Sequence, residues 1–203
     1  MSERKLTKDE QSRFDNYLKV EEEYLSKGYK KAELLLDEKK TNIIANVASI
    51  PIILVGIVLY FFVRKGSFNF NGLLFFVGIF ASIFIHEGIH GLTWATFSQN
   101  HFKDISFGII KEQLMPYCNC KAPLNKKHYL LGSAMPLIVL GIIVTIIGFV
   151  ADNYTITMIG LVNIASAMGD ILVIYKILTY KTDAKEIIYI DHPTKIGGVI
   201  FEK

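Results

Sequence analysis

The sequence predicts an all-α membrane protein with four transmembrane helices, an N-terminal amphipathic helix and small β-hairpin elements. Two observations predict this class. Hydrophobic residues make up 51% of the 203 residues, and the charged residues are unevenly spread, with ten of the 22 Lys and Arg and ten of the 19 Asp and Glu in residues 1–41. Four apolar stretches follow that segment, each close to the roughly 20 residues that cross a bilayer as a helix.

Residues 1–41 are expected to form a polar, cytoplasmic helical segment. Thr7 and Glu10 fit a capping box, and apolar residues recur at helical spacing across residues 7–25. After Gly28, the short segment 32–36 leads toward the membrane. This polar opening does not resemble a signal peptide, so the first apolar stretch is expected to act as an uncleaved anchor. The helix is expected to cover the domain; binding of a partner or the membrane surface is the alternative.

The four apolar stretches form a predicted membrane domain, residues 42–180. They cover residues 43–63, 72–97, 129–151 and 155–178. The first and third connections are short, whereas the loop 98–128 is long and polar.

Short strands are expected outside the membrane. Residues 104–110 alternate in the manner of a strand, and residues 114–124 could return beside them as a hairpin. The tail, residues 181–203, reads as strand, turn, strand, with the strands at residues 186–190 and 197–201.

The distribution of Lys and Arg predicts the orientation. Residues 1–41 carry ten, the loop 98–128 carries five and residues 176–203 carry five, whereas the first short loop carries two. Segments rich in Lys and Arg stay in the cytoplasm, so both termini and the long loop are expected there, in a multi-pass protein of the bacterial plasma membrane. The net charge of +3 is mild and residues 1–41 are balanced in sign, which argues against nucleic acid as a partner.

The motif that carries chemistry is His86-Glu87-Gly88-Ile89-His90, inside the second apolar stretch. Positions i and i+4 share one helix face, so both imidazoles can reach one ion. Neutral imidazole is a good zinc ligand, and zinc lowers the pKa of water to about 7, so Glu87 can take the proton. An ionisable residue at the bilayer centre costs roughly 2.5–3.5 kcal/mol, which a bound metal compensates. A polar cluster that joins helices is the alternative.

Asp170 is the best candidate for the third ligand that a catalytic zinc site usually has. It lies deep in the fourth apolar stretch, at the same predicted depth as His90. Asn163, seven residues earlier, is expected on the same helical face, where it could bind a substrate backbone or the metal shell. Pairing of Asp170 with Lys176, and simple helix packing by Asn163, are the alternatives.

Other residues could supply the third ligand. Glu112, 22 residues after His90, ranks second, and His192 in a predicted turn ranks third. Cys118 and Cys120 could bind metal as thiolates, although a Cys-x-Cys pair alone is weak evidence. The remaining histidines are expected at the membrane interface: His101 and His128.

Three segments of this sequence resemble the DUF3267 family of zincin peptidases. They are His-Glu-Gly-Ile-His-Gly-Leu-Thr-Trp at residues 86–94, Pro-Tyr-Cys-Asn-Cys-Lys-Ala-Pro at residues 116–123 and Asp-His-Pro-Thr-Lys-Ile-Gly at residues 191–197. The resemblance covers most of residues 40–200. The family is similar in plan to site-2 proteases, intramembrane zinc proteases in which an aspartate from a later helix completes the site.

This resemblance implies Zn²⁺ on His86, His90 and Asp170, with Glu87 as the general base. The sequence departs from the site-2 pattern, because no Pro lies between Asn163 and Asp170 and Ile follows the aspartate where Gly is usual. Both departures lie around Asp170, the third ligand that the resemblance implies.

The predicted function is hydrolysis of peptide bonds within or next to the membrane, by a four-helix metalloprotease domain at residues 42–180. The expected partners are the lipid bilayer and a peptide or membrane-protein substrate. A non-catalytic zinc-binding regulator is one rival, although metal binding alone does not need Glu87. A small transporter subunit is the other, although the polar residues concentrate in the cytoplasmic half of the helices.

Overall fold

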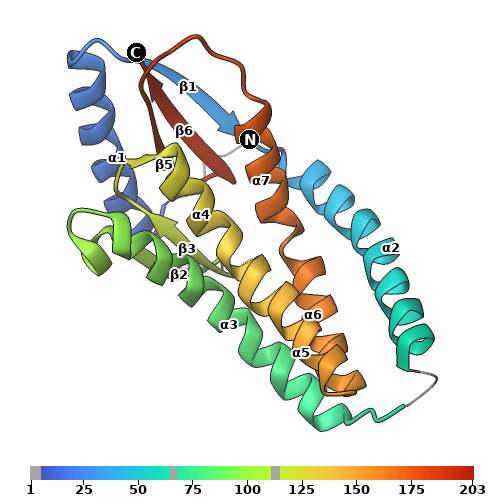
Figure 1. The fold of residues 1–203 in the computed structure, drawn as a ribbon. Helices are drawn as coiled ribbons and strands as arrows, with labels where there is room; N and C mark the ends of the chain where they lie inside the picture. Colours follow the sequence, from blue (N-terminus) through green and yellow to red (C-terminus); the bar gives the residue numbers. More distant parts are fainter. Residues whose placement is uncertain (1–5, 65–67, 111–114) are drawn as a thin grey trace.

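The structure, a computed structural model, describes residues 6–64, 68–110 and 115–203. A bundle of long helices carries, at one end, a four-stranded sheet covered by a helix (Figure 1). Three helices are long and apolar enough to cross a membrane, or four if a bent pair of helices is one span, within the described residues. The prediction of a helical, membrane-capable protein is therefore confirmed at this level.

The helices of the bundle match the four apolar stretches of the sequence. They are α2 (Glu38–Arg64), α3 (Gly72–Phe97), the continuous span of α4 (Lys126–Pro136), the π-helical η2 (Leu137–Ile143) and α5 (Val144–Val150), and the pair α6 (Tyr154–Ser166) and α7 (Met168–Thr179). The last pair is bent by 44° at Ala167, so the fourth stretch is a broken helix rather than a straight one.

Small residues let the helices of the bundle approach closely. A Cβ on Gly148 would lie 2.3 Å from the backbone nitrogen of Thr157, and one on Gly160 would lie 2.4 Å from that of Thr145. Glycine is required at both positions, because any side chain would separate α5 from α6.

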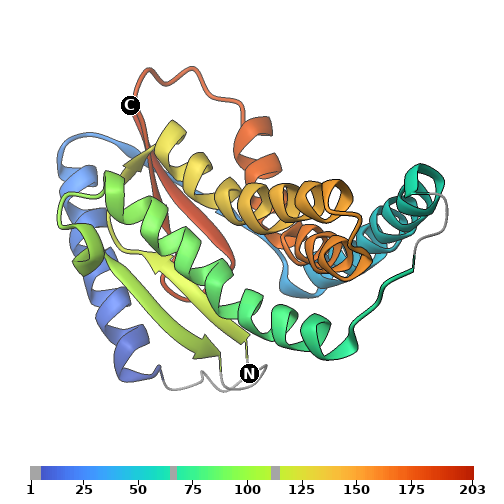
Figure 2. The same cartoon turned by 60° about the horizontal axis from the view of Figure 1, so that its bottom comes forward.

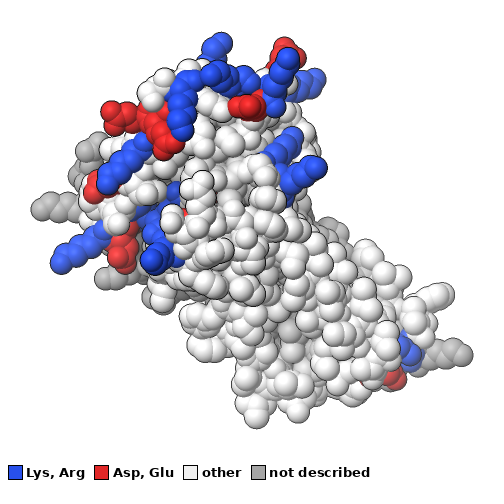
Figure 3. Space-filling model, turned by 60° about the vertical axis from the view of Figure 1, so that its left-hand side comes forward, with Lys and Arg blue, Asp and Glu red and all other residues white. Residues whose placement is uncertain are grey.

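Charged side chains gather at the end of the molecule that carries the sheet (Figure 3). A broad uncharged band follows along the bundle, and a few charges reappear at the far end. This distribution suits a bilayer around the bundle, with the sheet outside it.

The N-terminal helix α1 (Lys8–Ser26) begins at the predicted capping box. The backbone N–H of Glu10 donates to Thr7 Oγ1 at 3.2 Å, and the backbone N–H of Thr7 donates to Glu10 Oε2 at 2.8 Å. Tyr17 packs α1 onto the sheet, and Asn16 Nδ2 donates to the carbonyl of Lys121 at 2.9 Å. The helix thus covers the sheet, as predicted.

The four-stranded sheet joins three distant parts of the chain. Its antiparallel strands, in spatial order, are β1 (Lys30–Leu35), β6 (Gly197–Glu202), β5 (Ile187–Asp191) and β4 (Leu124–Asn125). The prediction that residues 1–41 are helical throughout is wrong at β1. A short apolar run such as this one is compatible with a helix or a strand. It forms a strand here because it pairs with β6, with Lys30 opposite Glu202.

A second sheet, of strands β2 (Ile105–Ile110) and β3 (Met115–Cys120), forms the predicted hairpin and follows the short helix η1 (His101–Asp104). It lies between α1 and α3 (Figure 2). Phe107 packs on Gly91 of α3, where a Cβ would lie 2.3 Å from the ring. On the other face, the Arg13 guanidinium of α1 lies 4.4 Å from the centre of the Tyr117 ring. The hairpin is therefore held against the helix that carries the His-Glu-x-x-His motif.

Candidate metal centre

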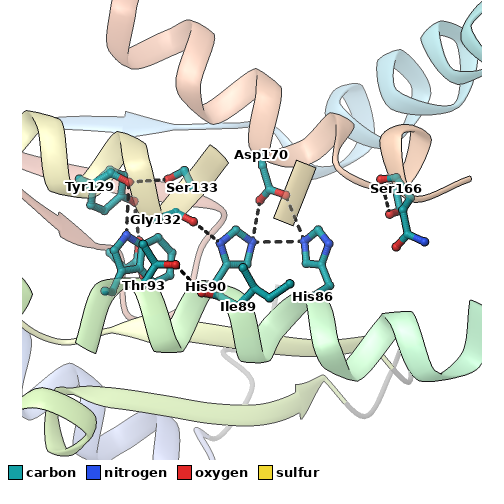
Figure 4. Close-up of polar contacts among 12 residues, drawn as sticks. His86, Ile89, His90, Thr93, Tyr129, Gly132, Ser133, Ser166 and Asp170 are labelled. Atoms are coloured by element: carbon teal, nitrogen blue, oxygen red, sulfur yellow. Dashed lines mark hydrogen bonds and ion pairs between the residues drawn. The ribbon is translucent and has the colours of Figure 1, made fainter. Parts of the chain in front are cut away.

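Helix α3 places the two histidines of the motif on one face. His86 and His90 are one helical turn apart, and their Nε2 atoms lie 3.2 Å from each other (Figure 4). The His90 side chain is 6% exposed and that of His86 is 13% exposed. Both rings therefore direct their Nε2 atoms toward one largely buried point.

Asp170 reaches that point from α7. Its Oδ2 lies 3.1 Å from His86 Nε2, and its Oδ1 lies 3.3 Å from His90 Nε2. The break at Ala167 puts Asp170 in the first turn of α7, where the positive end of the helix dipole favours a carboxylate. The bend that the sequence did not predict is thus what presents this aspartate to α3.

These three side chains fit a divalent metal ion. The atoms that they offer lie within 4.8 Å of one another, and among the described residues no other group of this kind is found. Donor atoms about 2.0–2.1 Å from a tetrahedral zinc lie roughly 3.3 Å apart, close to the separations of His86, His90 and Asp170. Two imidazoles and one carboxylate, with a fourth position left over, match the donor set of catalytic zinc sites.

The orientation of His90 is fixed by its other ring nitrogen. A carbonyl can only accept, so Nδ1 of His90 donates to the Gly132 carbonyl at 2.8 Å. In the neutral ring Nε2 then carries a lone pair aimed at His86 and Asp170. A lone pair that faces the Asp170 carboxylate is disfavoured unless a proton or a metal ion lies between them.

Aromatic rings hold His90 from the side away from Asp170. The Trp94 ring stacks on His90 with 5.1 Å between centroids, and Trp94 Nε1 donates to the carbonyl of Tyr129 at 3.2 Å. A Cβ on Gly132 would lie 2.0 Å from Trp94 Nε1. Gly132 is thus needed both for its carbonyl and for its lack of a side chain.

A partly buried carboxylate from the C-terminal sheet supports this aromatic stack. The Tyr129 hydroxyl donates to Asp191 Oδ1, and the backbone N–H of Cys120 donates to Asp191 Oδ2 at 2.7 Å. Burial raises the pKa of Asp191 to about 6, although these two hydrogen bonds oppose the shift. The hydrogen bond from Tyr129 thereby connects β5, in the C-terminal tail, to α4, the helix that supports His90.

Asp191 is expected to make stability depend on pH in a particular direction. The folded protein holds this proton more tightly than the unfolded chain, where the pKa is about 3.9. The contribution of Asp191 to the free energy of unfolding is therefore fully present below about pH 4 and is lost as the pH rises through about 6. The thermal unfolding midpoint of the wild type minus that of Asp191→Asn, measured in detergent, should fall across this window. A difference that is constant or rises with pH would contradict the assignment.

Glu87 lies beside the histidines, on the side of the helix that faces β3. The backbone N–H of Cys118 acts on its carboxylate as a hydrogen-bond donor, and the side chains of both histidines and Asp170 are close enough to act on it electrostatically. Glu87 is thus next to the three candidate ligands without being one of them, as the motif predicts.

Asn163 lies apart from the three candidate ligands. Its side chain is buried and donates to Ser82 Oγ at 3.1 Å and to the Ile159 carbonyl at 2.8 Å. The bend at Ala167 separates Asn163 from Asp170, so their spacing of seven residues does not place them on one straight helix face. In this structure Asn163 joins α6 to α3.

Among the described residues, His192, Cys118 and Cys120 are not part of the cluster. Nδ1 of His192 accepts from the backbone N–H groups of Thr194 and Lys195, at 3.2 and 3.0 Å, and so closes a turn. Glu112 lies outside the described residues. Burial raises the pKa of the Cys118 and Cys120 thiols, which disfavours the thiolates that bind metal.

His101 and His128, which the sequence predicts at the membrane interface, lie near the sheet end of α3. His128 stacks on Phe97 with 4.0 Å between centroids, and Nδ1 of His101 donates to the carbonyl of Ala95 at 3.0 Å. The sequence analysis assigned no role to the residues that support His90, namely Gly132, Tyr129 and Asp191. Asp191 is the first residue of the segment 191–197 that resembles a known family, and this is the signal in the sequence that marks it.

Comparison with known proteins agrees with the motif. No curated protein and no solved structure matches the chain. The model of the DUF3267 family, described as "Putative zincin peptidase", matches residues 79–185, which is more than half of the chain and includes both histidines, Glu87 and Asp170. The chain belongs to the DUF3267 family.

Proposed function

We propose that this protein is a membrane-embedded zinc metallopeptidase that cleaves peptide bonds within or next to the bilayer. The observation that carries the proposal is the meeting of His86, His90 and Asp170 from two different helices, beside Glu87. Membership of a family described as zincin peptidases agrees with it.

His86, His90 and Asp170 would hold the ion, and Gly132 keeps the His90 ring in the orientation that this requires. When bound, zinc supplies Lewis-acid chemistry, in which a carbonyl is polarised and water becomes acidic near neutral pH. The fourth position is left to water and substrate, because Glu87 is not a ligand.

Glu87 is the proposed acid and base. Its carboxylate takes a proton from water as the oxygen attacks the scissile carbonyl carbon. The resulting carboxylic acid then gives that proton to the leaving nitrogen, and the C–N bond breaks. The N–H of Cys118 holds the carboxylate in place during both transfers.

A substrate helix would have to unwind locally before cleavage, because its backbone groups are hidden by their own hydrogen bonds. Among the described strands β2 pairs only with β3, which leaves its other edge for an extended segment. We therefore propose that the substrate joins this edge and is presented to Glu87. The orientation follows the distribution of Lys and Arg, with the sheets and both termini in the cytoplasm, in a bacterial plasma membrane.

Removal of the metal tests the proposal. The purified protein is incubated in detergent with a mixture of synthetic apolar peptides, and cleavage is followed by mass spectrometry. Treatment with 1,10-phenanthroline should abolish cleavage, and one equivalent of Zn²⁺ should restore it. Stoichiometric zinc without any cleavage would instead favour a non-catalytic regulator, and cleavage that survives loss of the metal would overturn the proposal.

A further inference from the structure

A groove lies between α3 and the β2–β3 hairpin. Its volume is about 350 Å³, at the small end of the roughly 300–1,000 Å³ of ligand sites. Most of its walls are apolar. Its lining includes Phe84, Glu87 and Gly88 of α3 and Phe107, Ile109 and Pro116 of the hairpin.

Gly88 faces the open part of the groove. A Cβ on this residue would meet no atom within 4 Å, whereas a Cβ on Gly91, less than one turn later, would lie 2.3 Å from the Phe107 ring. The hairpin therefore closes on the helix at Gly91 and stands away from it at Gly88. Phe84 and Ile109, 50% and 54% exposed, form apolar walls at this opening.

The groove adjoins the candidate metal centre at Glu87. Glu87 is part of its lining and is close enough to His86, His90 and Asp170 for their side chains to act on it electrostatically. An occupant of the groove is therefore next to the carboxylate that would move the proton.

We propose that the groove receives a large apolar side chain of the substrate, from a residue next to the bond that is cleaved. This inference rests on the proposed function and adds a substrate class to it, namely extended peptide segments with Leu, Phe or a residue of similar size beside the scissile bond. Gly88 is the residue that determines this specificity.

The lining favours a peptide over a lipid chain. An ionisable carboxylate is costly against hydrocarbon alone, whereas the amide groups of a peptide can satisfy Glu87. The missing side chain at Gly88 also lets a main chain approach α3 closely. Phe84, Phe107 and Ile109 then contact the substrate side chain, which contributes most of the binding.

Photocapture tests the proposal without turnover. The Glu87→Gln protein in detergent is irradiated with an alanine heptapeptide that carries photoleucine at its centre, and the modified residues are located by mass spectrometry. Adducts are expected on Phe84, Phe107 or Ile109. Unlabelled peptides with central Leu or Phe should compete at about 10-fold lower concentration than those with Ala or Asp, in keeping with the size discrimination of apolar pockets.

A matched pair of glycine variants tests the groove itself. Gly88→Leu should lower the adduct yield about 10-fold, with Gly88→Ala intermediate. Gly169→Leu is the control, because Gly169 is equally open but does not line the groove. Adducts elsewhere, or a yield that Gly88→Leu leaves unchanged, would overturn the proposal, as would adducts suppressed by phospholipid but not by unlabelled peptide.

The outcomes separate this inference from the proposed function. If the protein binds zinc and is photolabelled at the groove but never cleaves a peptide, the groove is a peptide site and the proposed peptidase activity is wrong. If the wild type cleaves peptides and Gly88→Leu shows the same residue preference, the peptidase activity is supported and the groove does not select the substrate side chain.

Discussion

Replacement of Glu87 by Gln should abolish peptide hydrolysis and leave zinc bound. A positioned acid–base group typically contributes on the order of 10²–10⁴-fold to the rate, and a neutral amide cannot take the proton from water. Zinc content should not change, since the three candidate ligands are His86, His90 and Asp170. The loss should therefore appear in kcat, with the metal stoichiometry intact.

The measurement is cleavage of the synthetic peptide mixture beside metal analysis of the same sample. Glu33→Gln makes the same chemical change at an exposed position on β1 and should retain full activity. If Glu87→Gln turned over at the wild-type rate, Glu87 would not be the base, even if zinc were present.

Replacement of Asp170 by Ala should remove stoichiometric zinc. Loss of a supporting partner around a metal typically costs 10–100-fold in affinity, and loss of one of only three protein ligands should cost more than about 100-fold. The two remaining imidazoles share α3, so nothing from a second helix would then close the site. His86→Ala should have the same effect, because its Nε2 lies 3.1 Å from Asp170 Oδ2.

Zinc is best measured by elemental analysis after gel filtration in metal-free buffer. Asp183→Ala removes an exposed carboxylate near the end of α7 and serves as the matched control. Zinc retained at one equivalent in Asp170→Ala would show that another group completes the site. Loss of zinc in the control as well would point to general misfolding rather than to a ligand.

The sequence predicts what depends on neighbouring residues. The apolar stretches give α3 residue for residue and α2 without its first five residues and its last one. Thr7 with Glu10 gives the start of α1, because helix periodicity and capping are local. The meeting of His86 with His90 is likewise a property of one helix. The depth of Asp170 could be matched to His90 because both spans are counted from the same membrane surface.

What the sequence could not show depends on contacts between distant segments. Residues 30–35 are a strand because β6 pairs with them, and nothing near them signals that partner. The bend at Ala167 lies between Ser166 and Gly169. Such residues also occur in straight helices, so without Pro they do not predict a bend. Because a straight helix was predicted, Asn163 was expected on the same face as Asp170. In the structure its side chain donates a hydrogen bond to Ser82 instead.

The pairing of β1 with β6 has a consequence for biogenesis. Lys30 leaves the ribosome some 170 residues before its partner Glu202, and contacts so distant form late. The sheet can therefore close only after all the membrane spans have been made. Because Asp191 belongs to that sheet and reaches the stack behind His90, the support of this imidazole is assembled last, and a nascent chain still in the insertion machinery lacks it.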